Sequence, residues 1–204
     1  MATDPTAAAR TAGVSGRAIF ALVTVALAVF ACDQITKYFV VENLTLGEPV
    51  PVLGNVLDFV FVKNPGAAFS LASGATWIFS IAASLVTVLI IFFARRIRSL
   101  TWAIMFGMLL GGTLGNLADR LLREPSFGLG HVVDFIRVAG FPAVFNIADS
   151  FIVASMGLFI ILTIRGVGLD GQREQKPAAA KSGPAASGSL DSAPADSTPD
   201  ATER

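Results

Sequence analysis

The stretch TWIFSIAASLVTVLIIFFA, from Thr76 to Ala94, decides the fold, because it is apolar along most of its length and carries no charged residue. A helix of about 20 residues, rising about 1.5 Å per residue, crosses the hydrocarbon core of a bilayer. In lipid each backbone N–H and C=O must be satisfied within the protein, which a helix does within one segment. The stretch therefore predicts a membrane-spanning helix.

Three further apolar blocks are long enough to cross a bilayer, at about 18–41, 100–122 and 145–164. Each carries its charged residues near one end. Apolar residues make up 53% of the 204 residues, and they come in blocks rather than interspersed with polar residues as in a soluble domain. The sequence thus predicts an all-α integral membrane protein with four transmembrane helices.

Orientation follows from the basic residues, which fall on one side of the membrane if the chain crosses four times. They precede the first span, separate the second from the third, and follow the fourth: Arg10, Arg17, Arg95, Arg96, Arg98, Arg165, Arg173, Lys176 and Lys181. This pattern places both termini in the cytoplasm. The segments 42–75 and 123–144 then lie on the outer face.

The domain organisation expected from composition has three parts. Residues 1–16 are rich in Ala, Thr and Gly and predict a disordered cytoplasmic N-terminal tail. Residues 17–166 form the membrane domain. Residues 167–204 are dominated by Ala, Pro, Ser, Gly and charge, which predicts a disordered cytoplasmic C-terminal tail.

The N-terminal block has a second interpretation as a cleavable lipoprotein signal, because Val29-Phe30-Ala31-Cys32 follows an apolar run. Phe30 is bulky where a small or modest residue is expected, and the apolar pattern resumes after Lys37. We therefore expect a retained first helix in which Cys32 is a small buried residue.

The first outer segment predicts strands. The run Val56–Val62 is β-branched and aromatic, and it is bounded by Gly54 and by a turn at Asn64-Pro65-Gly66. We expect a small extracytoplasmic β-sheet at the membrane surface.

Several classes of function are disfavoured by composition. The formal net charge is zero, so nothing suggests nucleic acid as a partner. The single Cys32 excludes an internal disulfide framework. His131 is the one histidine, which disfavours a protein-ligated zinc site, and we expect no metal site.

Polar residues recur at the outer ends of the spans, where charge in or near hydrocarbon is costly. The first span carries Asp33 and Lys37 four residues apart, hence able to pair on one face, and we expect Asp119 to pair with Arg120 or Lys37. By topology the whole set should lie at one depth: Asp33, Lys37, Asn116, Asp119, Arg120, Asn146 and Asp149. Gly107, Gly111 and Gly115 form a small-residue ridge that lets another helix approach closely.

Asp134 and Asp149 are the candidates for direct chemistry. Asp134 is embedded in the apolar run Val132–Ile136, and Asp149 lies one turn inside the fourth span. Two carboxyls in a low-dielectric site raise each other's pKa, so that one tends to stay protonated near neutral pH. Such a pair contains both an acid and a base, and it can activate a water molecule. Spacing alone leaves open whether the two meet.

Two other classes of function compete with a hydrolase on these residues. A small proton- or ion-coupled transporter would use intramembrane Asp, Asn and Arg as a relay. The polar residues cluster at one face, however, and no inverted repeat is evident. A structural membrane protein would use them only as anchors, which leaves Asp134 unexplained.

Five segments, in order, closely resemble the signature segments of the lipoprotein signal peptidases, also called signal peptidase II. They are DQITK (33–37), NPGAAFS (64–70), GGTLGNLADR (111–120), HVVDFI (131–136) and FNIADS (145–150). The resemblance covers about residues 18–165. Each string is weak evidence alone, whereas five in the right order on the expected spans are specific.

The resemblance implies a four-helix aspartyl protease of the bacterial cytoplasmic (inner) membrane. It would remove signal peptides from diacylglyceryl-modified prolipoproteins by cleaving before the lipidated cysteine, without a cofactor. It implies Asp134 and Asp149 as the catalytic dyad. It implies the remaining site residues as lining or site-supporting groups: Asn64, Gly66, Asn116, Arg120, Asn146, Asp33, Lys37 and Asp119. The expected partners are the lipidated prolipoprotein and membrane lipids, and we expect a monomer.

One departure from the family's shorter members is the segment Leu121–Gly130, LLREPSFGLG, which lengthens a loop beside the expected site. The motifs themselves are undisturbed.

Overall fold

The computed structural model describes residues 15–66 and 76–173. Along the chain the elements are α1 (Gly16–Asn43), β1 (Pro49–Leu53), β2 (Leu57–Asn64), α2 (Thr76–Phe93), the short 3₁₀ helix η2 (Ala94–Arg96), α3 (Leu100–Leu122), β3 (Val132–Val138), β4 (Val144–Phe145) and α4 (Ile147–Ile164). All four α-helices are long and apolar enough to cross a membrane. The predicted fold class is confirmed.

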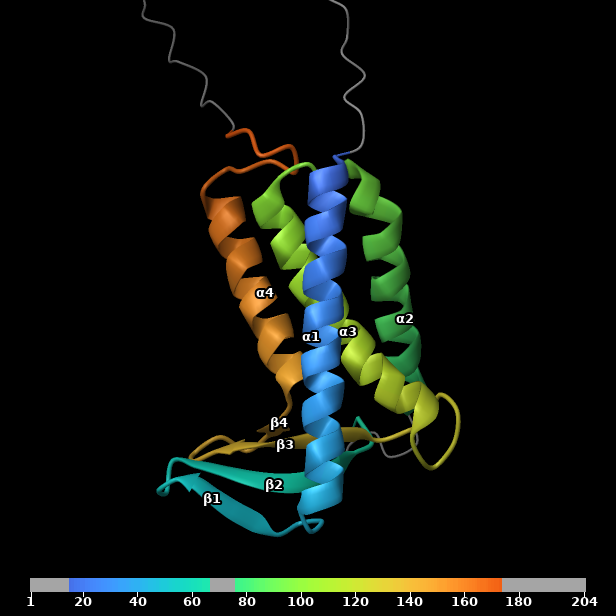
Figure 1. Ribbon diagram of the computed structural model, residues 1–204, viewed down its shortest axis with the longest axis vertical. Helices are drawn as coiled ribbons and strands as arrows, with labels where there is room; N and C mark the ends of the chain where they lie inside the picture. The colour runs from blue at the N-terminus through green and yellow to red at the C-terminus, as the bar shows by residue number, and fades with distance from the viewer. Residues whose placement is uncertain (1–14, 67–75, 174–204) are drawn as a thin grey trace, which may run out of the picture. The chain divides into compact units, whose positions relative to one another are not determined.

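The four α-helices run side by side, and the small sheet lies across one end of them (Figure 1). The beginning of α1, the α2–α3 connection and the end of α4 lie at the opposite end. This arrangement separates the two segments expected on the outer face from the basic residues expected in the cytoplasm.

The predicted spans agree with the helices to within a few residues at each end. The third span, 100–122, matches α3 at both ends. The first helix is longer than predicted at both ends. The fourth begins at Ile147 rather than 145, because Val144 and Phe145 form β4.

Helix α3 packs against each of the other three helices. Its glycines make this possible: a Cβ on Gly107 would lie 2.8 Å from the Leu22 carbonyl oxygen, and one on Gly111 would lie 2.6 Å from that of Ala26. Both contacts are closer than a real Cβ tolerates, so the predicted ridge brings α1 against α3. Gly112 makes the same kind of approach to Ala148 of α4.

The sheet has the strand order β1-β2-β3-β4, and every pair is antiparallel. The strand predicted at 56–62 corresponds to β2. Its partner β3 comes from the second outer segment, which the sequence had indicated only as an apolar run around Asp134. Val133 and Phe135 of β3 pack with Phe61 and Val40 in a cluster of buried apolar residues. This packing fixes the sheet to the end of α1.

Two expectations at the edges of the fold change. Cys32 is exposed on the outside of α1, not buried, because the helix turns Val29, Asp33 and Lys37 inward. Described structure also continues past the expected boundary at residue 166, as far as Arg173, in a turn whose Leu169 carbonyl accepts hydrogen bonds from the N–H groups of Arg98 and Ser99. Most of both expected disordered tails lies outside the described residues.

Candidate active site

Asp134 and Asp149 are joined through one residue, Asn146. The side-chain Nδ2 of Asn146 donates to Asp134 Oδ1 at 2.7 Å, and its backbone N–H donates to Asp149 Oδ2 at 3.2 Å. Asp134 comes from strand β3 and Asp149 from the first turn of α4. Two acids from separate elements are thus held by the side chain and the backbone of a single residue.

Asn146 can do this because it caps helix α4. Its Oδ1 accepts the Asp149 N–H at 2.9 Å, and the Asp149 carboxylate accepts the Asn146 N–H in return, which makes a capping box. Capping satisfies two backbone donors that a helix start leaves without partners. The positive end of the helix dipole also favours a carboxylate in the first turn. The start of α4 therefore fixes Asp149 in place.

The register of the sheet places Asn64 beside Asp134. Val62 pairs with Asp134 and Asn64 pairs with Val132, so Asn64 and Asp134 are diagonal neighbours on one face. Asn64 Nδ2 donates to Asp134 Oδ2 at 2.7 Å. The Gly66 N–H donates to Asn64 Oδ1 at 2.8 Å, which holds the amide in this orientation.

Asn116 of α3 links the acids to a buried lysine. Its Oδ1 accepts from Lys37 Nζ and from Asn146 Nδ2, each at 2.9 Å, and its Nδ2 donates to Asp149 Oδ1 at 2.8 Å. Because an ammonium group can only donate, Lys37 dictates which end of the Asn116 amide faces it. The NH₂ end must then face Asp149.

Lys37 lies between two carboxylates in a site closed to solvent. Its Nζ is 2.8 Å from Asp33 and 2.8 Å from Asp119, with side-chain exposures of 0% for Lys37, 0% for Asp33 and 1% for Asp119. Arg123 adds a second cation, at 2.6 Å from Asp119. Two positive and two negative groups thus balance, as the three buried charges require; the Arg123 side chain is 31% exposed.

The carboxylates of Asp33 and Asp119 also hold the backbone next to each candidate catalytic acid. Asp33 Oδ1 accepts the Ala148 N–H at 2.9 Å, directly before Asp149. Asp119 Oδ2 accepts the Val133 N–H at 3.1 Å, directly before Asp134. One lysine therefore organises both strand β3 and helix α4.

Arg120 does not form an ion pair with Asp119. Of the two expected partners for Asp119, Lys37 forms the pair, and Arg120 turns toward Asn116, whose carbonyl it reaches at 3.4 Å. Its guanidinium lies over the Phe79 ring at 5.6 Å. Within the described residues, the buried Arg120 Nε has no hydrogen-bond partner.

Burial raises the pKa of Asp134 to about 6. Three groups oppose this rise in the Asp134 pKa: the hydrogen bond from Asn64, the hydrogen bond from Asn146 and the positive charge of Lys37. The negative charge of Asp149 adds to the rise. Asp134 is 3% exposed, so loss of water around the ionised form is the dominant cause. A carboxyl with this pKa changes protonation state close to neutral pH.

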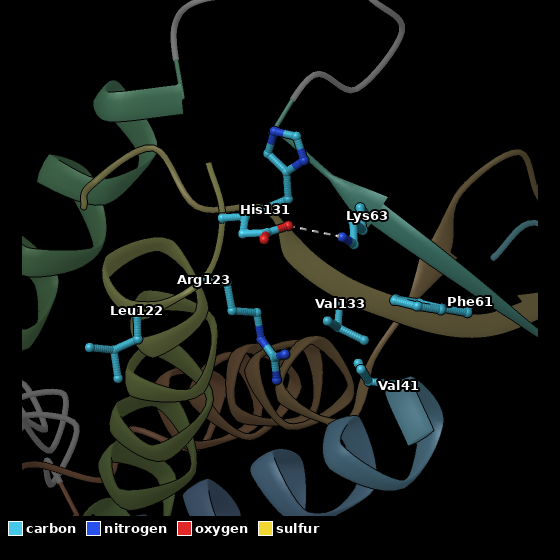
Figure 2. Close-up of a pocket in the computed structure, with 8 residues that line it drawn as sticks. Val41, Phe61, Lys63, Leu122, Arg123, His131 and Val133 are labelled. Atoms are coloured by element: carbon cyan, nitrogen blue, oxygen red, sulfur yellow. Dashed lines mark hydrogen bonds and ion pairs between the residues drawn. The ribbon is translucent and has the colours of Figure 1, made fainter. Parts of the chain in front are cut away.

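Two cavities meet at Lys63 of strand β2. One, of about 430 Å³, is lined by Asn64, Gly66, Arg120 and Asp134 together with Val62, Lys63, Pro65, Pro142, Ala143 and Val144. The other, of about 280 Å³, lies between the ends of α1 and α3 and the strands, where Lys63 approaches Glu124 at 3.5 Å (Figure 2). The first cavity opens on Asp134, so it is the candidate substrate cleft.

Gly66 is placed where the chain leaves β2, with φ of +94°. A Cβ there would lie 2.6 Å from the Phe79 ring, so both the turn and the close approach require glycine. The rest of its motif, residues 67–70, lies outside the described residues. Leu121–Gly130 is described, and its Gly128 carbonyl accepts from Ser80 Oγ of α2 at 2.7 Å.

All ten expected site residues thus lie in or beside one cluster. The sequence analysis missed two kinds of group that help to hold the site together. Arg123 stands four residues after Asp119, a helical pairing distance that could have indicated it. The Val133 and Ala148 N–H groups carry no side-chain signal. Among the described residues, no three His, Cys, Asp or Glu side chains are grouped as metal ligands would be.

Comparison with known proteins agrees with this architecture. Residues 25–165 match the family model described as signal peptidase (SPase) II. The chain is 58% identical to the lipoprotein signal peptidase of Leifsonia xyli, over 78% of this chain and 73% of that protein. It is 42% identical to that of Rhodococcus jostii, over 84% and 86%. It is 41% identical to that of Mycobacterium tuberculosis strain H37Rv, over 82% and 86%.

A solved structure described as a bacterial membrane enzyme is similar as well, with a TM-score of 0.66 and 28% identity, over 80% of this chain and 98% of that one. A second, described in the same words, has a TM-score of 0.65 and 29% identity, over 75% and 97%. Sequence, spans and structural likeness agree, and the chain belongs to the signal peptidase II family of multi-pass bacterial membrane proteases.

Proposed function

We propose that this protein is an aspartic endopeptidase that removes signal peptides from diacylglyceryl-modified prolipoproteins, cleaving before the lipidated cysteine. The observation that carries the proposal is the contact of Asn146 with both Asp134 and Asp149, at 2.7 and 3.2 Å. Family membership supports the substrate class. The assignment of these two acids as the dyad rests on their geometry.

In this mechanism the pair activates water. One carboxylate takes a proton from the attacking water while the other carboxyl donates a proton to the oxygen or nitrogen of the scissile amide. Asp134, with a pKa of about 6, can serve in either state near neutral pH. The two protons belong to the coupled pair, so neither role is assigned to one residue.

Substrate binding is assigned to the cleft beside Asp134. An extended peptide presents unpaired carbonyl and N–H groups, which polar side chains in the cleft can engage. Arg120 lines the cleft and has a donor that no described residue uses. We infer that Arg120 and Asn64 hold the peptide across the two acids.

The depth of the cluster suits a lipidated substrate. A diacylglyceryl group keeps the cut site at the membrane surface. Asp134 belongs to strand β3 and Asp149 to the first turn of α4, and the sheet lies across that end of the helices (Figure 1). The arginines at the opposite end favour cytoplasmic termini and an extracytoplasmic site. We propose that the enzyme works as a monomer among membrane lipids and requires no cofactor.

A gel-shift assay tests the proposal. Purified protein is incubated with a diacylglyceryl-modified prolipoprotein and with the same precursor lacking the lipid, beside Asp134→Asn and Asp149→Asn variants. Wild-type protein should release the signal peptide from the lipidated precursor and not from the precursor lacking the lipid. The modified cysteine should be the new N-terminus. Each variant should lose at least about a thousandfold in rate, as removal of a catalytic group usually does.

The folded state of the variants is checked by thermal unfolding in detergent. Substantial cleavage by both correctly folded variants would disprove the dyad. Failure of folded wild-type protein to cut the lipidated precursor would disprove the activity itself, and a test for proton-coupled flux would follow.

A further inference from the structure

The end of the helices opposite the sheet carries a basic cavity of about 590 Å³ that the proposed peptidase activity does not use. Its walls come from two segments distant in the sequence. One is the α2–α3 connection, and the other is the turn after α4. The lining residues are Arg95, Arg96, Arg98, Gly168, Leu169, Asp170, Gln172 and Arg173.

The second wall is a structured turn. The Leu169 carbonyl accepts from the N–H groups of Arg98 and Ser99 at 2.9 and 3.0 Å, and the Trp102 indole N–H donates to the Val167 carbonyl at 3.0 Å. Within the turn, Gly168 N–H donates to the Gln172 carbonyl at 2.8 Å. These bonds hold the two segments together, so the cavity is built into the fold.

The charge of the cavity is strongly one-sided. Four of its eight lining residues are arginines, and Asp170 is the one acid among them. Asp170 Oδ1 accepts the Gln172 N–H at 3.0 Å, and the Arg96 guanidinium lies over the Phe93 ring at 5.2 Å. Guanidinium groups match the geometry of phosphate oxygens and bind them through paired hydrogen bonds.

The cavity also sits where a lipid headgroup would be. Arg95 directly follows the apolar run of α2, and Leu100 begins α3, so the connection lies at the membrane–water boundary. Phe92 and Ile164, at the ends of α2 and α4, are 70% and 80% exposed and offer apolar surface for acyl chains. Basic pockets between helices on this side of a membrane bind anionic headgroups.

We propose that this cavity, formed by 95–98 and 168–173, is a binding site for the phosphate group of an anionic phospholipid. Phosphatidylglycerol has the required chemistry, with one phosphodiester and no compensating cation in its headgroup. Phosphatidylcholine carries the same phosphate with a quaternary ammonium and should bind less well. The site is independent of peptide cleavage at the other end.

Native mass spectrometry of the full chain in detergent tests the proposal, with phosphatidylglycerol and phosphatidylcholine of the same acyl chains added at increasing concentration. A double variant, Arg95→Gln with Arg173→Gln, removes one cation from each wall. A matched control, Lys63→Gln with Arg137→Gln, removes two cations at the sheet end. The wall variant should weaken phosphatidylglycerol binding by about tenfold or more, and the control should leave it unchanged.

Equal loss in both double variants would show attraction by overall charge and would overturn the site. Competition by inorganic phosphate at concentrations comparable to the lipid would show an adventitious anion site instead of a lipid site. The C-terminal segment carries its own acids at Asp191, Asp196, Asp200 and Glu203. If phosphatidylglycerol bound only after these were neutralised to Asn and Gln in the full chain, the tail would be the occupant and the proposal would be wrong.

Discussion

The two ends of the helix bundle handle charge in opposite ways. At the sheet end, Asp33, Lys37 and Asp119 are 0–1% exposed, and each is paired. At the other end, Arg95, Arg96 and Arg173 are exposed, and all three are positive. Buried charges must find partners of opposite sign, and their partners fix the backbone. Exposed charges need no such partners, and they create a field that acts on whatever lies outside.

The largest effect on stability is expected at Lys37. Lys37→Met keeps the length of the side chain but leaves Asp33 without a cation and Asp119 with Arg123 alone. Breaking a buried pair by removing one partner costs about 3–5 kcal/mol. Thermal unfolding in detergent should show a strongly destabilised protein, whereas Arg95→Met at the other end should change stability by less than about 0.5 kcal/mol.

A second variant separates lost charge from lost packing. Adding Asp33→Asn to Lys37→Met removes the carboxylate that is left without a cation, since Asp119 keeps Arg123. The double variant should then be more stable than the sum of the single changes predicts, by about 1 kcal/mol or more. Simple additivity would mean that Lys37 acts through packing alone.

Much of this cluster could be predicted from the sequence, and the reason is local geometry. Asp33 and Lys37 stand four residues apart on a helix, and Gly107, Gly111 and Gly115 mark the face that another helix contacts. The hydrogen bonds of Asp33 to Ala148 and of Asp119 to Val133 span 115 and 14 residues, and they end on backbone groups. Any residue has a backbone N–H, so no residue type could indicate them.

Of the two longest strands of the sheet, the sequence predicted β2 but not β3, again because long-range contacts leave no local signal. The run 56–62 is rich in β-branched and aromatic residues and is bounded by turn residues, which together indicate a strand. Val132–Val138 carries an acid in the middle of an apolar run, and its identity as a strand depends on pairing with β2. Strand propensity depends on such neighbours more than helix propensity does.

The pH dependence of stability should reveal how Asp134 is buried. Its pKa rises from 3.8 to about 6 on folding, so the native state holds a proton that the unfolded chain has lost between these values. Stability from this group therefore falls as pH rises through the window from about 4 to 6. A shift of about two units corresponds to about 3 kcal/mol at most.

The measurement is the difference between wild-type and Asp134→Asn unfolding free energies at each pH, since other carboxylates titrate in the same range. The wild-type protein should lose its advantage as pH approaches 6, and the difference should be flat above it. A difference that grows with pH would mean that the hydrogen bonds from Asn64 and Asn146 outweigh burial.

The glycine ridge connects the two ends and gives a smaller effect. A Cβ at Gly107 would meet Leu22 and Val25, and one at Gly115 would lie 2.5 Å from Asp33 Oδ2. Gly107→Ala and Gly115→Ala should each cost about 1–3 kcal/mol by overpacking. Gly115→Ala alone should also lower the cleavage rate, because it displaces Asp33. The control is Gly157→Ala in α4, where the added methyl meets nothing within 4 Å. If Gly107→Ala lowered the cleavage rate as much as Gly115→Ala does, the loss of activity could not be assigned to the displacement of Asp33.

The smallest effect tests whether burial, and not position at the sheet end, makes Lys37 matter. Arg137 and Asp58 also form an ion pair at the sheet end, at 2.6 Å, but their side chains are 41% and 24% exposed. Water and salt screen such a pair, so Arg137→Gln should cost no more than about 1 kcal/mol. Raising the salt concentration should narrow that difference further, while leaving the cost of Lys37→Met nearly unchanged. Comparable costs for the two substitutions in thermal unfolding would show that the end of the molecule, and not solvent exclusion, governs what a charge contributes.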